Sequence, residues 1–281
     1  MDGTDGYVEL PPNIFNDLGE ATVEAWVKWD RLTGPGWNRV FNYGTAKHDL
    51  GIAVQDTNTL WFVLLDAETG LQELKVPNVV KLGEWIHVAC VSGKGGMRAY
   101  VNGALAGSNS YSGSFSALKT GELNRIGRTV TVNDQDLSQD QGRSQRPRYY
   151  DPPFQGQIDE VRVWNVARTE EQIRESMSVK LTGQELGLAG LWNFDDPANP
   201  GRDATPEGHH GTLMGNARVV PDDRVRQSPA AANLVLALDG ESNIETDAVV
   251  VDTSKDWTVE CWAFAPLAAG GAYRHLVAQD N

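Results

Sequence analysis

A long polar segment, residues 129–153, holds a cluster of side chains that could bind a cation. Its first half carries Asp134, Asp136 and Asp140 among asparagine and glutamine residues. Carboxylate and amide oxygens are the ligands of hard cations, which take about six to eight oxygen atoms in proteins. The spacing of these three aspartates differs from the spacing of the calcium ligands in an EF-hand loop. Two interpretations stay open, a cation site and an acidic loop that is only solvated.

The second half of the same segment is basic and aromatic where the first half is acidic, and Arg148, Tyr149 and Tyr150 are consecutive there. Aromatic rings and guanidinium groups on a loop give a binding surface a large contact area at little cost in entropy. The same side chains could instead pin the loop to the rest of the fold. Trp37 follows a Gly-Pro-Gly turn and has two similar interpretations, a recognition platform or a lid over one end of the core.

The sequence contains no visible catalytic motif. A retaining glycosidase needs two carboxylates about 5 Å apart, and the corresponding Glu-x-Asp-x-x-Glu pattern is absent, since Glu245 and Asp247 are followed by Val250 at the third position. Nucleophile-elbow, zinc-helix, P-loop and dinucleotide-binding motifs are also absent. His209 and His210 lie between two glycines, which favours a turn over a metal site. We therefore expect a protein that is not an enzyme.

Composition excludes several other classes of protein. The chain has 281 residues, 40% of them hydrophobic, which is enough to bury a substantial core. Its 24 basic and 38 acidic side chains give a net charge of −14, which repels polyanions and argues against a nucleic-acid partner. The longest apolar run, residues 60–65, is far too short to span a bilayer, so we expect no membrane insertion. Two cysteines, Cys90 and Cys261, cannot form a disulfide framework.

Short runs of β-branched and aromatic residues broken by turn residues predict an all-β sandwich. The Asn102-Gly103 pair lies between two apolar runs and is a strong signal for a hairpin turn. One helix is expected over residues 169–177, where Thr169 and Gln172 can form a capping box. The clearest strands are predicted at residues 22–29, 38–43, 49–54, 59–65, 85–91, 97–101 and 158–164.

The chain contains an internal repeat. Asp2-Gly3 recurs as Asp239-Gly240, and the segment TVEAW at residues 22–26 recurs as TVECW at residues 258–262. Between the two copies the chain is polar, bounded by prolines and aperiodic. The prediction is therefore a complete domain at residues 1–220, a linker at residues 221–233, and an incomplete N-terminal part of a second copy at residues 234–281.

Five sequence elements occur in an order and spacing typical of one family. They are Asp2-Gly3 followed by YVE, TVEAWV at residues 22–27, WIHVA at residues 85–89, YVNG at residues 100–103 and FQGQIDEVRVWN at residues 154–165. Over residues 1 to about 220 the chain resembles the laminin G-like family of the concanavalin A-like lectin/glucanase superfamily, in its bacterial, pentraxin-related form. The resemblance implies a two-sheet antiparallel jelly-roll sandwich with one short helix, followed by a truncated second copy.

The resemblance also implies a calcium cofactor. Pentraxin-like relatives have an acidic calcium-binding loop in the stretch that corresponds to residues 134–140, although the individual ligands do not align. Asp2 and Asp159 belong to the shared motifs and have two interpretations. They could hold a second calcium ion, or they could accept hydrogen bonds from backbone amides in turns, which needs no ion.

The function we expect is that of a non-catalytic recognition module. It would bind an extracellular carbohydrate or protein surface through the 129–153 segment and the Trp37 turn, with calcium ordering the acidic loop. Family members are repeated in large secreted or surface proteins, so we expect an extracellular or cell-surface location and neighbouring domains of a larger parent chain. The alternatives are a structural spacer in an adhesin or sensor ectodomain, and an accessory module of a glycoside hydrolase.

Overall fold

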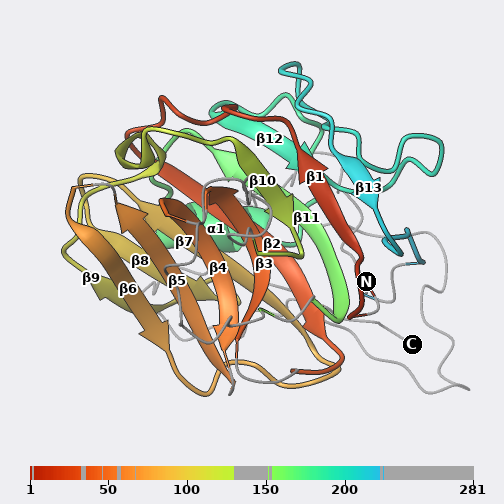
Figure 1. Ribbon diagram of the computed structural model, residues 1–281, viewed down its shortest axis with the longest axis horizontal. Coiled ribbons are helices and arrows are strands. Elements are labelled where there is room, and N and C mark those ends of the chain that lie inside the picture. The colour runs from red at the N-terminus through yellow and green to blue at the C-terminus, as the bar shows by residue number, and fades with distance from the viewer. Residues whose placement is uncertain are drawn as a thin grey trace, which may run out of the picture. The chain divides into compact units, whose positions relative to one another are not determined.

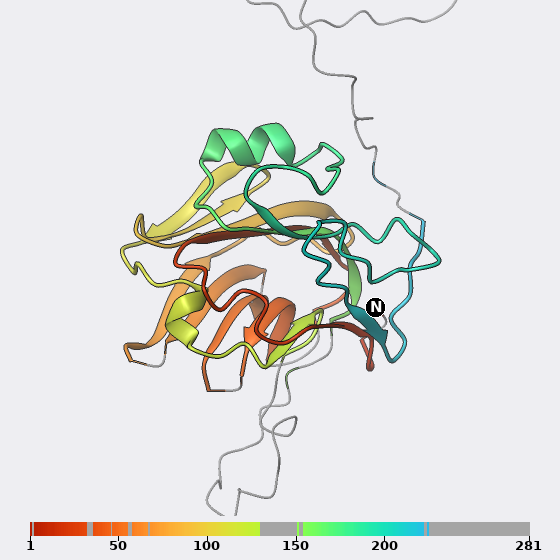
Figure 2. The same cartoon turned by 90° about the horizontal axis from the view of Figure 1, so that it is seen from above.

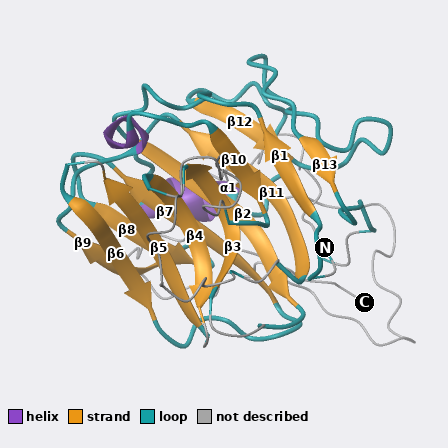
Figure 3. Cartoon of the chain, viewed as in Figure 1, coloured by secondary structure: helices purple, strands orange, loops and turns teal. Residues whose placement is uncertain are grey.

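The computed structural model describes residues 1, 3–32, 36–45, 47–55, 58–66, 68–129, 151, 154–221 and 224. They form two antiparallel sheets that pack face to face (Figures 1 and 2). Apart from a short 3-10 helix, η1 (Phe115–Leu118), and one α-helix, α1 (Glu170–Ser176), the described chain consists of strands and loops (Figure 3). The predicted jelly-roll sandwich is therefore confirmed.

Seven strands form the first sheet and six form the second. In spatial order the first contains β13 (Thr212–Met214), β1 (Tyr7–Leu10), β10 (Leu123–Ile126), β3 (Trp37–Gly44), β4 (Asp49–Gln55), β5 (Thr59–Asp66) and β6 (Gly70–Val76). The second contains β12 (Leu188–Trp192), β11 (Gly156–Trp164), β2 (Ala21–Trp29), β7 (Trp85–Ser92), β8 (Met97–Val101) and β9 (Ala104–Asn109).

Alternation along the strands explains why the two sheets pack together. In β2, Val23, Ala25, Val27 and Trp29 all belong to the buried core between the sheets, while the residues between them lie on the outer side. The hairpin predicted at Asn102-Gly103 joins β8 to β9, and both residues have the positive φ that the turn requires, 50° and 77°. Long apolar strands thus build a core that fixes which side chains remain on each outer face.

The predicted linker and second copy lie outside the described residues, except for Pro221 and Arg224. The domain boundaries therefore remain predictions. Among the described residues, no helix has the length and apolar character needed to cross a bilayer.

The outer face of the six-stranded sheet carries a buried cluster of charges centred on Glu24 of β2. Oε1 of Glu24 accepts hydrogen bonds from the Trp164 indole at 2.7 Å and from Nη1 of Arg168 at 3.1 Å. Nη1 of Arg162 lies 3.7 Å from the same oxygen, and Nε2 of His87 lies 3.3 Å from Oε2. Burial alone would raise the pKa of Glu24, but His87 and the two guanidinium groups lower it to about 2.

The two arginines of this cluster also hold helix α1. Arg162 donates to the carbonyl oxygens of Ser176 and Val179 at 2.9 and 2.8 Å, and Arg168 donates to that of Gln172 at 2.8 Å. The predicted capping box is present at the start of the helix. Ile173 on its inner side packs in a small apolar cluster on the sheet. Helix α1 therefore covers part of this outer face (Figure 2).

We expect Glu24→Gln to lower the free energy of unfolding by about 3 kcal/mol at pH 7, because Arg168 stays buried without a compensating charge, whereas Arg162 keeps its ion pair with Glu160 at 2.9 Å. The pKa of Glu24 is about 2 in the folded chain and 4.5 as its ordinary value. The contribution of the ionised Glu24 carboxylate to the free energy of unfolding is therefore complete above about pH 4.5 and is lost as the pH falls toward 2. Urea unfolding of parent and variant at pH 7 and pH 3 measures both effects.

The matched control is Glu170→Gln, which removes the same charge from an exposed carboxylate 3.9 Å from Arg174 on α1. Its expected effect is below about 0.5 kcal/mol. Equal stabilities of the Glu24→Gln variant and the parent at pH 7 would contradict the role given to the cluster.

Candidate functional site

Two tryptophans form an aromatic pair on the outer side of the seven-stranded sheet. Trp37 begins β3 and Trp61 lies in β5, between Leu60 and Phe62, which face the core. The ring centroids are 4.9 Å apart and the planes meet at 86°, an edge-to-face contact. Ala53 of β4 pairs with Trp61 and adds only a methyl group between the two strands. Both rings remain partly exposed.

Cations lie over these rings. Nζ of Lys75 is 3.9 Å from the centroid of a Trp61 ring, and the guanidinium carbon of Arg39 is 5.1 Å from that of Trp37. Further along the same sheet, the guanidinium carbons of Arg125 and Arg128 each lie 4.9 Å from the Tyr7 ring centroid. Such contacts fix the orientation of an aromatic surface and place positive charge beside it.

The backbone of Trp37 is tied to both ends of the segment that the sequence singled out. Its N–H donates to Oδ1 of Asp151 at 3.0 Å, and its carbonyl accepts from the Thr129 hydroxyl at 3.5 Å. Nη1 of Arg125 donates in turn to the Thr129 carbonyl at 3.1 Å. The structure therefore brings the Trp37 turn and the two ends of the 129–153 segment together at one place.

The other residues predicted in that segment lie outside the described part of the chain. They are Arg148, Tyr149 and Tyr150 for ligand binding, and Asp134, Asp136 and Asp140 for calcium. Their roles remain predictions.

A buried polar layer lies on the sheet next to the aromatic pair. Nη2 of Arg39 forms an ion pair with Oδ2 of Asp49 at 2.9 Å. Burial raises the pKa of Asp49, Arg39 opposes that rise, and the charge of Asp151 adds to it. A β-carbon on Gly51 would lie 1.4 Å from Nη1 of Arg39, so the guanidinium occupies the space that a side chain would need there.

Several polar atoms of this layer have no hydrogen-bond partner within the described part of the chain. Among the described residues, nothing forms a hydrogen bond with Nε or Nη1 of Arg39, with either polar atom of the Asn42 amide, or with the Trp61 indole nitrogen. Arg39 is 5% exposed and Asn42 is 1% exposed. Unpaired buried polar groups are costly, and several of them lie beside the aromatic pair.

Asp159 lies on the outer face of the other sheet. Its Oδ1 accepts a hydrogen bond from the Glu160 amide at 2.8 Å, and its Oδ2 contacts the guanidinium of Arg224. That guanidinium lies over Trp26 and Trp85, at 5.3 and 4.4 Å from their ring centroids. The carboxylate of Asp159 thus meets an amide and a cation of the protein itself.

The calcium sites remain predictions. Asp2, the predicted partner of Asp159, lies outside the described residues. Within the described ranges, no three His, Cys, Asp or Glu side chains gather in a group that could hold a metal ion.

The sequence interpretation missed most of the described site. The sequence predicts for Trp61 only a place in the strand at residues 59–65, and no functional motif contains Arg39, Asn42 or Asp49. The local sequence gives no signal for Trp61, because residues 60–65 are all apolar and their polarity does not show which of them face the core. No local signal shows that Trp37 lies next to it, since β4 separates the two strands.

Comparison with known proteins gives a family match and several similar folds. The family model described as the concanavalin A-like lectin/glucanases superfamily, laminin G type, matches residues 2–174. No match was found among curated proteins. A Bacteroides ovatus protein described as carbohydrate binding has a similar structure, with 21% identity and a TM-score of 0.54 over 76% of this chain. This chain covers 59% of that protein's length.

Two further solved structures are more distant. Domain 4 of an extracellular GH43 arabinanase from Geobacillus stearothermophilus, solved with arabinotriose, has 20% identity and a TM-score of 0.46, covering 62% of this chain and 73% of that one. The CBM40 module of a Ruminococcus gnavus sialidase, bound to α2,3-sialyllactose, has 11% identity and a TM-score of 0.47, covering 62% and 96%. By its family match over residues 2–174 and its two-sheet fold, the chain belongs to the laminin G-like family of the concanavalin A-like lectin/glucanase superfamily.

Proposed function

We propose that this domain is a non-catalytic carbohydrate-recognition module of a larger extracellular or cell-surface protein. The observation that carries the proposal is the partly exposed Trp37–Trp61 pair beside unpaired polar groups of Arg39 and Asn42. Aromatic rings offer flat apolar surface to the C–H face of a sugar, and amide and guanidinium groups bind its hydroxyls. The described carbohydrate binding of the Bacteroides ovatus protein supports this choice of ligand.

The 129–153 segment would form the rest of the site. Thr129 and Asp151 both contact Trp37, and Asp151 directly follows Arg148, Tyr149 and Tyr150 in the sequence. Calcium bound by Asp134, Asp136 and Asp140 would order the acidic half of the segment. The reaction of any attached hydrolase would then lie in a neighbouring domain, because this chain lacks the paired-carboxylate motif of a retaining glycosidase.

A glycan array probed with the full chain tests the function. After the array has identified a ligand, Trp61→Ala and Trp37→Ala are each expected to weaken its binding by about tenfold or more, since each truncates one ring of the platform. Trp85→Ala is the control, because Trp85 is a partly exposed tryptophan on the opposite sheet. Isothermal titration gives the affinities. Absence of binding to every glycan, with and without calcium, would favour the spacer alternative.

Asn42→Leu tests whether the buried polar layer serves a ligand. Removing an amide with no partner is expected to raise the free energy of unfolding by about 1–3 kcal/mol and to weaken glycan binding. The matched control is Asn124→Leu, because the Asn124 amide donates to Pro11 and Gly121 at 2.7 and 2.9 Å and accepts from Gly44. That control should lose stability. A destabilised Asn42→Leu variant with unchanged glycan affinity would contradict a ligand-binding role.

The calcium prediction has its own test. Calorimetric titration of the full chain with calcium is expected to show binding heat that disappears in the Asp134→Ala plus Asp136→Ala variant. The Glu170→Ala plus Glu171→Ala variant removes the same number of charges from α1 and should keep the heat. No heat with the parent chain would remove calcium from the proposal and leave the aromatic site intact.

A further inference from the structure

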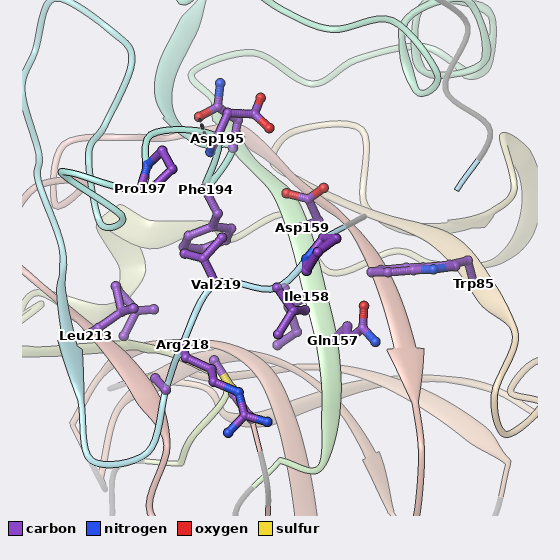
Figure 4. A pocket seen from close by; sticks show the side chains of 16 residues that line it. Trp85, Gln157, Ile158, Asp159, Phe194, Asp195, Pro197, Leu213, Arg218 and Val219 are labelled. Carbon is purple, nitrogen blue, oxygen red and sulfur yellow. Dashed lines mark hydrogen bonds between the residues drawn. The ribbon is translucent and has the colours of Figure 1, made fainter. Parts of the chain in front are cut away.

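A second pair of tryptophans lies on the outer face of the six-stranded sheet. Trp26 of β2 is diagonal to Trp85 of β7 in the antiparallel ladder, and Asp159 of β11 is directly opposite Trp26. Val27 and Ile86, the next residues along the two strands, belong to the core, so both rings face outward. Asp159 and Trp85 also line the pocket drawn in Figure 4. The space bounded by the two rings and the Asp159 carboxylate is called the tryptophan slot below.

The tryptophan slot holds the guanidinium group of Arg224. The guanidinium carbon lies 4.4 Å from the ring centroid of Trp85 and 5.3 Å from that of Trp26, and Nη2 donates a hydrogen bond to Oδ2 of Asp159. Only 9% of the Arg224 side chain is exposed. A guanidinium group offers flat faces to aromatic rings and N–H donors in its plane to a carboxylate. Rings and carboxylate together therefore match arginine better than lysine.

Other contacts of the sheet orient the two rings. The Trp26 indole N–H donates to the carbonyl oxygen of Met177 at 2.6 Å, and its ring lies edge-to-face with the His87 ring at 5.4 Å between centroids. Nζ of Lys28, which is opposite Trp85 in the ladder, lies 5.2 Å from the centroid of a Trp85 ring. None of these contacts uses Arg224. The rings of the slot are therefore held in place by the domain itself, which lowers the entropy cost of binding a side chain there.

A bulge in β11 supplies the carboxylate of the slot. The register of β11 against β2 shifts between Asp159 and Arg162, and Glu160 within the bulge has a φ of 51°, a conformation that residues other than glycine rarely adopt. The Glu160 carboxylate accepts a hydrogen bond from Nη2 of Arg162 at 2.9 Å. Consecutive residues of a regular strand point to opposite faces. The bulge instead allows both acidic side chains to meet arginines on the outer face, Glu160 with Arg162 and Asp159 with Arg224.

Arg224 lies in the part of the sequence predicted to be a linker, residues 221–233. Residues 217–221, which follow β13, line the pocket of Figure 4 together with Trp85 and Asp159, so the chain follows the domain surface toward the slot. We propose that the tryptophan slot is an arginine-binding site and that Arg224 is its ligand, anchoring the chain to the outer face of the six-stranded sheet. This anchor moves the start of the linker from residue 221 to residue 225. It lies on the face opposite to the Trp37–Trp61 pair.

Trypsin tests the anchor, because the protease must bind the arginine side chain and can cut after Arg224 only when that side chain has left the slot. We expect Asp159→Asn and Trp85→Ala in the full chain to speed this cleavage by about fivefold or more, measured by mass spectrometry. Cleavage after Arg218, an exposed arginine of the same segment, is the internal control and should change by less than about twofold. Unchanged cleavage after Arg224, or an equal increase after both arginines, would overturn the proposal.

The full chain with Arg224→Ala tests the slot separately, because the rings and the carboxylate remain. The indole N–H signal of Trp85 is followed by NMR of the tryptophan-labelled chain and is assigned with Trp85→Phe. We expect N-acetylarginine amide to shift this signal saturably and N-acetyllysine amide to bind about fivefold more weakly or worse. In the matched control, Arg218→Ala, Arg224 still fills the slot and the signal should not move. No saturable shift with Arg224→Ala, or equal binding of the two amides, would overturn the assignment of an arginine site.

Discussion

The fold of this domain depends on one buried carboxylate. Glu24 meets two guanidinium groups on the outer face of the six-stranded sheet, away from water. Each arginine would be very costly to bury alone, and Glu24 would be as costly without them. Other N–H groups of the two arginines donate to carbonyl oxygens of α1 and of the segment after it. The last carbonyl groups of a helix have no partner within the helix, so these bonds stabilise its C-terminal end. Sheet, helix and following loop are thus stabilised as one unit.

This arrangement makes the two outer faces chemically different. The face that carries Glu24 satisfies most of its buried charges and supports α1. The face that carries Trp37 and Trp61 retains donors on Arg39 and Asn42 that the described residues leave unpaired. A fold can tolerate a few such groups when its core is otherwise well packed, as it is between these sheets. The proposed function assigns the binding surface to the second face and the support of α1 to the first.

Patterns of neighbouring residues predict the fold well and the site poorly. Two-residue alternation, the Asn102-Gly103 turn and the Thr169 capping box are local, and each leads to the element that is observed. Contacts at the site join strands that are not adjacent in the chain, as with Trp37 and Trp61. The bulge between Arg39 and Phe41 changes the alternation within β3 as well. The pairing of Asp159 with Arg224 joins residues so far apart in the chain that no spacing rule could predict it.

The attachment of the 129–153 segment to Trp37 uses the main chain of that residue, with Asp151 and Thr129 as its partners. The anchor therefore does not depend on the amino acids between those two ends. Residues 130–150 could change in length and sequence without moving the tryptophan pair, in the way that antibody frameworks carry variable loops. Under the proposed function, replacement of this loop alone would change the ligand, and the same anchor offers a position for grafting a chosen binding sequence.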